Sequence, residues 1–254
     1  MKKEVRIKST DDIKRIRDCG RIIYDIFMQI RLMDLAGLTT WEVDSYIEDF
    51  ILKNRARPAF KTIKGYGFAS CISVNNVASH GVPSKKCRIQ KGDIVKIDVG
   101  TVMHGYFADS CSTFVIEEAS EDALNLVKGA FGALLSGISQ MHPGKKIGDI
   151  GCAIESYVTG LGYSVVKNFT GHGVGYALHE SPIVPSYGCK GQGLTLKEGM
   201  VMTVEPIVNQ GLGELIVLDD GWTSVTADGG LSAQFEHTIA ITADGPFLLT
   251  AGFD

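Results

Sequence analysis

The sequence predicts an α+β fold in which two similar halves share one curved antiparallel sheet, with helices on its outer face. Three observations support this fold class: helical patterns occur in pairs, strand patterns follow them in runs, and the whole plan occurs twice. Because the strands are not separated one by one by helices, a parallel sheet of alternating strand and helix units is disfavoured. We expect a single domain over residues 1–254, with halves of about residues 1–116 and 117–254.

An internal duplication is indicated by spacing. Shifting the chain by 107 residues against itself superimposes Gly37 on Gly144, Gly92 on Gly199, and Asp98 on Glu205. The offset stays constant over that whole stretch, which chance explains poorly. Low identity between the halves makes the duplication an inference from spacing. It implies that a ligand site lies where the two halves meet.

The helices are predicted from apolar residues at helical spacing behind capping residues. Residues 11–33 follow the polar run Ser9-Thr10-Asp11-Asp12, and residues 40–54 follow Thr39. Their counterparts in the second half are residues 121–140 and 147–160. Each half therefore begins with two helices.

The strands are predicted from alternating runs rich in Val, Ile, Thr and Phe. These runs span residues 94–100, 106–116, 200–209, 214–218 and 234–242. The segment from Thr101 to Gly105 can close a hairpin between the first two. That hairpin would place Asp98 and Asp109 on neighbouring strands.

Composition excludes several classes of protein. With 44% hydrophobic and 21% charged residues, the chain is neither disordered nor too small to build a core. A net charge of −4 gives no general attraction to nucleic acid or to anionic membranes. The amino-terminal stretch lacks the apolar core of a signal peptide, and no run is long enough to span a membrane. The six cysteines form no CxxC pair, which argues against a zinc ribbon or a thioredoxin-like motif. Since no export signal is seen and a chain of this size needs no disulfides to fold, we expect reduced thiols and a cytoplasmic location.

Four carboxylates interrupt otherwise apolar strand patterns: Asp98, Asp109, Glu205 and Glu236. Any one of them alone is most simply explained as a residue on the solvent face of a strand. Buried carboxylates are rare unless they are paired or bind a metal. Four such acids, two in each half, with Asp98 and Glu205 at equivalent positions, favour a shared site.

Histidines extend this candidate site. His172 lies between Gly171 and Gly173, and glycine allows a ligand to approach the backbone closely. Two further candidates, His80 and His179, also lie in glycine-flanked or charged segments. A surface or core role is the common alternative for each, and it is the role expected for His104, His142 and His237. Four carboxylates and one histidine suit two divalent ions such as Mn, Fe, Co or Zn, whose charge the four acids balance.

Five motifs cover these residues. They are Ser73-Val-Asn-Asn-Val-Ala-Ser-His-Gly-Val-Pro83, Lys91-Gly-Asp-Ile-Val-Lys-Ile-Asp98, Gly171-His-Gly-Val-Gly175, Gly199-Met-Val-Met-Thr-Val-Glu-Pro206 and Ser232-Ala-Gln-Phe-Glu-His-Thr-Ile239. With them, the chain resembles the methionine aminopeptidases of the creatinase and prolidase-like "pita-bread" metallopeptidases, in their short bacterial type I form. The resemblance extends from Ile7 to Thr250.

The resemblance implies a role for each of these residues. The metal ligands would be Asp98, Asp109, His172, Glu205 and Glu236, with Asp109 and Glu236 bridging two divalent ions. The catalytic residues would be His80, His179 and Glu205, the last handling the proton of the attacking water. The backbone carbonyls of Asn75, Val77 and Ser232 would hold a monovalent cation, Na⁺ or K⁺.

The resemblance also implies a pocket for the first side chain of the substrate. Its residues would be His80, His179, Tyr66, Cys71, Trp222, Phe60, Leu178 and Gln234. The chain departs from the family at Leu178, where an aromatic residue is expected, and at Ser79, where a cysteine is expected. Phe60 and Ile63 would replace pocket residues of the usual loop. Since Leu178 is smaller than the expected residue, we expect a roomier pocket that still prefers methionine.

The implied activity is removal of the first methionine from nascent polypeptides or peptides with a small second residue. The ribosome is a further partner to consider, whereas no specific nucleic acid and no membrane is expected. We expect a monomer. Two alternatives stay open: a dipeptidase that cleaves Xaa-Pro substrates, and a binding protein on the same scaffold without catalysis.

Overall fold

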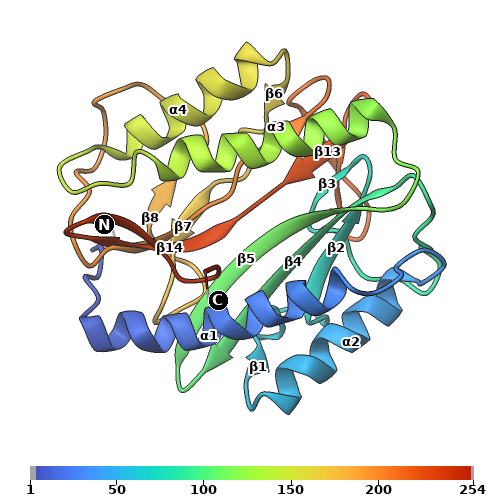
Figure 1. The fold of residues 1–254 in the computed structure, drawn as a ribbon, viewed down its shortest axis with the longest axis horizontal. Coiled ribbons are helices and arrows are strands. Elements are labelled where there is room, and N and C mark those ends of the chain that lie inside the picture. Colours follow the sequence, from blue (N-terminus) through green and yellow to red (C-terminus); the bar gives the residue numbers. More distant parts are fainter. Residues whose placement is uncertain (1–3, 253–254) are drawn as a thin grey trace.

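The computed structural model describes residues 4–252. Four α-helices are paired as expected: α1 (Thr10–Ile30) with α2 (Thr40–Lys53), and α3 (Glu121–Ile138) with α4 (Ile147–Gly160). Figure 1 shows α1 and α2 along one half of the molecule and α3 and α4 along the other, with the long strands between them. The first three residues of the stretch that lacks a signal-peptide pattern lie outside the described residues.

Side-chain caps set the start of α1 and α2. The Ser9 hydroxyl accepts from the backbone N–H of Asp12, and the Asp12 carboxylate accepts from the backbone N–H of Ser9. Thr39 and Glu42 make the same reciprocal pair at α2. Such capping boxes satisfy backbone donors that a helix leaves free. The sequence therefore placed the helix starts to within a residue or so.

Fifteen strands are described, and all their named pairings are antiparallel. They are β1 (Arg57–Pro58), β2 (Ser70–Val74), β3 (Val77–Ser79), β4 (Ile94–Met103), β5 (Tyr106–Val115), β6 (Ser164–Val165), β7 (Gly171–Gly173), β8 (Glu180–Val184), β9 (Val201–Val204), β10 (Ile207–Asn209), β11 (Leu215–Val217), β12 (Ser224–Thr226), β13 (Ser232–Gln234), β14 (His237–Thr242) and β15 (Gly245–Leu248). A short 3₁₀ helix spans Phe60–Thr62.

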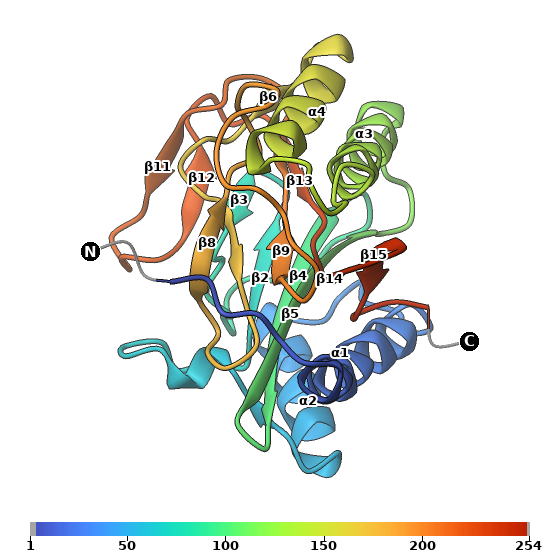
Figure 2. The ribbon, with the colours of Figure 1, turned by 90° about the vertical axis from the view of Figure 1, so that its left-hand side faces the viewer.

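The strands form four hydrogen-bonded sheets rather than one unbroken sheet. Their orders are β1-β4-β2 with β5 beside β4, then β13-β10-β6, β11-β12-β3, and β15-β14-β9-β7-β8. The two halves meet where β5 runs beside the segment that leads into β14. There the backbone N–H of Glu236 donates to the carbonyl of Cys111 at 2.9 Å, and the Ser110 hydroxyl donates to the carbonyl of Glu236. Figure 2 shows this region from the side.

The β4–β5 hairpin is tighter than expected. Its turn contains only His104 and Gly105, because Met103 pairs with Tyr106. Both turn residues have positive φ, 52° and 82°, as a two-residue hairpin with the twist of its strands requires. The expected turn of Thr101 to Gly105 was therefore too long.

Two strands that the sequence predicts as continuous are each interrupted. The run over residues 200–209 splits into β9 and β10 at Glu205 and Pro206, and the run over residues 234–242 splits at Phe235 and Glu236. Proline has no N–H to donate to a strand ladder. The two acids thus lie at breaks in the pairing, where their side chains are free to serve the site.

Equivalent contacts recur in the two halves at the spacing of the sequence repeat. Thr39 bridges to Arg88 in the first half, and Lys146 bridges to Thr195 in the second. The glycine before each bridge has φ near 90° and donates to a backbone carbonyl at 2.9 Å: Gly37 to Ile89, and Gly144 to Leu196. These matching contacts support the inferred duplication.

Two large apolar cores lie mainly one in each half, and each includes residues of the other half. One cluster joins α1 and α2 to β4 and β5, and the other joins α3 and α4 to β9, β13 and β14. In the part of the chain that the structure describes, no helix has the length and apolar character needed to cross a lipid bilayer.

Candidate active site and metal centre

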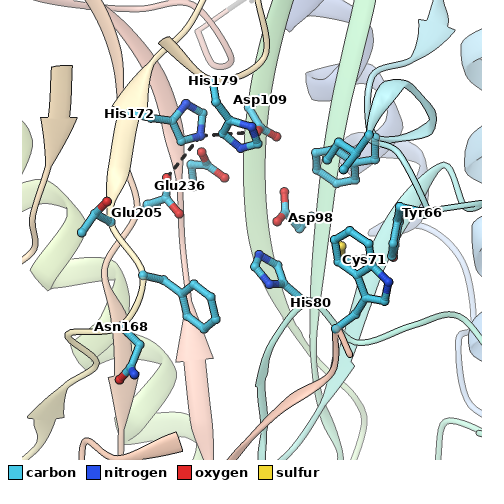
Figure 3. A pocket seen from close by; sticks show the side chains of 15 residues that line it. Tyr66, Cys71, His80, Asp98, Asp109, Asn168, His172, His179, Glu205 and Glu236 are labelled. Carbon is cyan, nitrogen blue, oxygen red and sulfur yellow. Dashed lines mark ion pairs between the residues drawn. The ribbon is translucent and has the colours of Figure 1, made fainter. Parts of the chain in front are cut away.

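A cavity of about 380 Å³ opens between the two halves, and Figure 3 shows the side chains around it. Its lining combines an acidic side with an aromatic side. The lining residues are Phe60, Ile63, Tyr66, Cys71, His80, Asp98, Asp109, Asn168, Phe169, Thr170, His172, His179, Glu205, Trp222 and Glu236. All five predicted metal ligands are among them.

The two halves contribute jointly to the acidic side. Asp98 on β4 pairs with Cys111, and Asp109 on β5 pairs with Gly100, so the two carboxylates are diagonal neighbours in the hairpin. Glu205 follows β9 and Glu236 precedes β14 in the second half. The Asp109 backbone is held by Thr238, whose hydroxyl donates to the Asp109 carbonyl at 2.7 Å. The site therefore depends on the contact between halves.

The potential ligand atoms fall into overlapping groups, each with its atoms within 4.8 Å of one another. One group is Asp98, Asp109 and Glu236, and another is His172, Glu205 and Glu236. Glu236 belongs to both, which suits a carboxylate that bridges two ions. A third group contains Asp109, His172 and His179. Asp109 thus also belongs to two groups.

Several carboxylate oxygens in this cluster lack a partner within the protein. Oδ1 of Asp98, Oδ1 of Asp109 and Oε1 of Glu236 are buried and make no hydrogen bond to any residue. Leaving a buried acceptor unsatisfied costs about 1–3 kcal/mol. The donor set therefore fits divalent cations, which would satisfy these oxygens.

The pKa values of the acids agree with this interpretation. Burial raises the pKa of Asp98 to about 7 and that of Glu205 to about 8. Burial, reinforced by the neighbouring acids, raises the pKa values of Asp109 and Glu236 well above their usual range. Without a cation the cluster therefore retains protons at neutral pH.

His172 is oriented toward the acids. Its Nδ1 lies 3.1 Å from the carbonyl of Gly173, a contact that requires the proton on Nδ1. Nε2 then presents its lone pair 3.6 Å from Glu205 Oε1 and 3.8 Å from Asp109 Oδ2. Burial lowers the pKa of His172 to about 3, so the ring is neutral and available as a ligand at neutral pH.

Thr203 positions both His172 and Glu205. Its hydroxyl accepts from the backbone N–H of His172 at 3.0 Å and donates to Oε1 of Glu205 at 2.8 Å. One side chain on β9 therefore sets the spacing of two predicted ligands. The sequence motif contained Thr203, but nothing in the pattern indicated this role.

The aromatic side of the cavity is a connected cluster. Tyr66 packs edge to face against Trp222 at 5.1 Å between ring centroids and against Phe60 at 6.4 Å. The Tyr66 hydroxyl is satisfied by the carbonyl of Ser70 at 2.8 Å. Burial keeps the pKa of the Cys71 thiol well above its usual range, so this thiol is an apolar part of the wall.

His80 and His179 lie between the acidic and aromatic sides. The His179 ring is 4.4 Å from the ring of His172, and the His80 ring is 4.7 Å from Phe169. Burial lowers the pKa of both histidines, so both rings are neutral at neutral pH.

Sequence reasoning missed Asn168, Phe169 and Thr170, which line the cavity from an irregular segment before β7. Their position two to four residues before His172 was the available signal.

Two predicted pocket residues do not line the cavity. Leu178 is buried in the apolar cluster that contains Phe60, Tyr66 and Val102, so it supports the wall from behind. Gln234 is buried on β13, where its backbone exchanges hydrogen bonds with the Thr113 hydroxyl. At the predicted monovalent-cation position, the structure has a protein group in contact with two of the three expected carbonyls. Lys96 Nζ donates to the carbonyls of Asn75 and Ser232.

Comparison with known proteins agrees with this geometry. The sequence profile described as Metallopeptidase family M24 matches residues 14–243. Methionine aminopeptidase A of Synechocystis sp. is 41% identical over 248 residues, which cover 98% of each chain. The crystal structure of methionine aminopeptidase from Thermotoga maritima superimposes with a TM-score of 0.96 at 37% identity, covering 98% of this chain and 100% of that one.

Prolidases share the fold at lower similarity. The prolidase from Pyrococcus horikoshii has a TM-score of 0.77 and 28% identity, and the match covers 96% of this chain but only 63% of that one. The similarity to methionine aminopeptidases extends over nearly the full length of both proteins. The chain therefore belongs to metallopeptidase family M24, in its methionine aminopeptidase branch.

Proposed function

We propose that this protein hydrolyses the first peptide bond of polypeptides that begin with methionine. The observation that carries the proposal is the continuity of two surfaces in one cavity: the acidic cluster and the aromatic wall. An apolar, polarisable wall suits an unbranched thioether side chain. The acidic cluster lies where the adjoining peptide bond would be.

The residues that would hold divalent ions are Asp98, Asp109, His172, Glu205 and Glu236, with Asp109 and Glu236 shared. When bound, two ions of the Mn, Co, Fe or Zn type supply an activated water and polarise the scissile carbonyl. The chain's own contribution is to keep the five ligands at fixed spacing and the His172 ring in one tautomer.

The remaining polar groups handle hydrogen bonds and protons. His179 donates from its neutral ring to the oxygen of the scissile carbonyl as negative charge develops there. His80, held against Phe169, hydrogen-bonds the scissile amide region. Glu205, whose Oε1 accepts from the Thr203 hydroxyl, would take the proton of the attacking water and pass it to the nitrogen of the leaving amine.

Phe60, Ile63, Tyr66, Cys71 and Trp222 form the pocket for the first side chain. The substrates would be nascent polypeptides with a small second residue, which the ribosome presents as they emerge. Six free cysteines suit a reducing compartment, so we place the protein in the cytoplasm.

The test compares Met-Ala-Ser with Ala-Pro, using protein loaded with Mn²⁺ or Co²⁺ and metal-stripped protein as the control. We expect rapid release of methionine from Met-Ala-Ser by the loaded protein alone. Faster cleavage of Ala-Pro would instead identify a dipeptidase like the prolidases that share the fold. Full metal occupancy with no cleavage of either peptide would identify a binding protein.

A further inference from the structure

Lys96 is the most unusual buried residue outside the acidic cluster. It lies on β4 with 1% of its surface exposed, and it is the largest fully buried side chain in the part of the chain described. Strand alternation puts it on the same face as Asp98. Lysine is almost never fully buried unless its nitrogen is partnered. The structure must therefore contain a site built to receive this group.

Two backbone carbonyls receive it. Nζ lies 2.6 Å from the carbonyl oxygen of Asn75 and 2.7 Å from that of Ser232. These are two of the three carbonyls that the family resemblance assigns to a monovalent cation. An ion bound to both oxygens would need the space that Nζ occupies. The residues present therefore do not fit a free Na⁺ or K⁺ at this position.

The local backbone is arranged around this contact. Asn75 has φ of 50° in the turn between β2 and β3, and its side-chain oxygen accepts from the backbone N–H of Ile94 at 3.0 Å. Its amide nitrogen donates to Asp93 at 2.8 Å. The backbone N–H of Ser232 also donates to the Asn75 carbonyl, at 3.2 Å. The carbonyl that faces Lys96 is thus held by both halves of the molecule.

We propose that the Lys96 side chain is the permanent, covalently tethered occupant of the monovalent-cation position, so that this enzyme needs neither Na⁺ nor K⁺. Lys96 is then a positioning residue. It joins β4, which carries Asp98, to β13, which leads into Glu236. A tethered group loses less entropy on entering the site than a free ion that must be captured from solution.

The contact does not depend on the charge of the amine. Both the ammonium and the neutral amine have hydrogens to donate to the two carbonyls. A free ion is excluded in either case.

The first measurement uses the wild-type protein. Its Tm, with and without bound divalent metal, and its kcat/KM for Met-Ala-Ser are compared in NaCl, KCl and choline chloride at equal ionic strength and fixed pH. We expect no difference among the three salts. A Tm or kcat/KM that rises with Na⁺ or K⁺ but not with choline would overturn the proposal.

The second measurement removes the tether. Lys96→Ser should lose about tenfold or more in kcat/KM in choline chloride, as for residues that support metal ligands. Na⁺ or K⁺ should restore its Tm and activity, because an ion that binds only the folded state stabilises it by mass action. Lys96→Met, which fills the space without a donor, should show no such rescue. Lys128→Ser, on the exposed face of α3, is the matched control.

Equal rescue of Lys96→Ser by all three salts, or no rescue by any, would contradict the proposal, since the carbonyls would then have no cation preference. If Lys96→Ser does not fold in any salt, the wild-type comparison decides alone. The Tm of the metal-free protein reports on the site independently of catalysis, so failure of the peptidase assignment would not affect it.

Discussion

The imidazole rings of His172 and His179 pack edge to face with their centroids 4.4 Å apart, but only His172 is oriented by a backbone carbonyl toward two carboxylates. The His179 side chain keeps part of its surface open to the cavity, whereas His172 is largely covered. This asymmetry is the basis for assigning His172 to metal binding and His179 to the substrate, although both lie in one possible ligand group with Asp109.

Substitution of His179 tests this assignment. His179→Ala should lower kcat about 10²–10³-fold, the usual effect of removing one donor to a developing oxyanion. Its metal content, measured by elemental analysis after dialysis, should stay at the wild-type value. Loss of an ion together with the activity would make His179 a ligand and transfer its proposed role to another residue.

Asp109→Asn should affect both ions, because Asp109 groups with Asp98 and Glu236 on one side and its Oδ2 lies 3.8 Å from His172 Nε2 on the other. We expect an inactive protein whose affinity for each divalent ion is lower, as shown by calorimetric titration. Asp122→Asn on the exposed first turn of α3 removes an acid far from the site and should change nothing. Retention of activity by metal-stripped wild-type protein, with metal content near zero, would refute the metal assignment itself.

The stability of the metal-free protein should fall as pH rises. The folded-state pKa values of Asp98 and Glu205, about 7 and about 8, lie above their usual values of 3.8 and 4.5. The folded state therefore holds protons that the unfolded chain has released, so the free energy of unfolding decreases from about pH 4 to about pH 8. Urea unfolding at several pH values measures this slope.

The double variant Asp98→Asn, Glu205→Gln is the control for this pH dependence. In the metal-free double variant, the free energy of unfolding should decrease less steeply as pH rises than in the wild type. In the wild type, Mn²⁺ should raise Tm more at pH 8 than at pH 6, because fewer protons must be displaced. A slope of the same size in the double variant would show that other groups cause the pH dependence.

The pocket can be tested with a pair of substitutions. Phe60 lines the cavity and Leu178 supports it from behind. Phe60→Leu should change the ratios of kcat/KM among methionine-, leucine- and norleucine-first tripeptides. The expected change is about 10–200-fold, which corresponds to about 1–3 kcal/mol in transition-state free energy. Leu178→Phe should sharpen the preference for methionine, but this change in selectivity should be smaller than the change caused by Phe60→Leu. The added volume of the phenylalanine should also lower Tm. A larger change in selectivity from Leu178→Phe would mean that residue 178 contacts the substrate.

Much of the fold could be predicted because local signals were strong. Capping residues at Ser9 and Thr39 and the apolar spacing behind them indicated the helices, and these features act within a few residues. The breaks at Glu205 and Glu236 were not predicted. Pro206 was an available signal for the first break, whereas the segment around Glu236 has strand-like composition throughout. Pairing partners far along the chain decide where such a segment leaves the ladder.

The sequence by itself determined which residues could do chemistry: carboxylates in apolar surroundings and a histidine between glycines are costly unless they serve a site. Only the tertiary structure decided how they combine. It placed Glu236 in two ligand groups, brought Phe169 to the cavity, moved Leu178 behind the wall and directed Lys96 onto the carbonyls of Asn75 and Ser232. The physical reason is that each of these outcomes depends on contacts between segments far apart in the sequence, whose geometry exists only once the two halves have packed together.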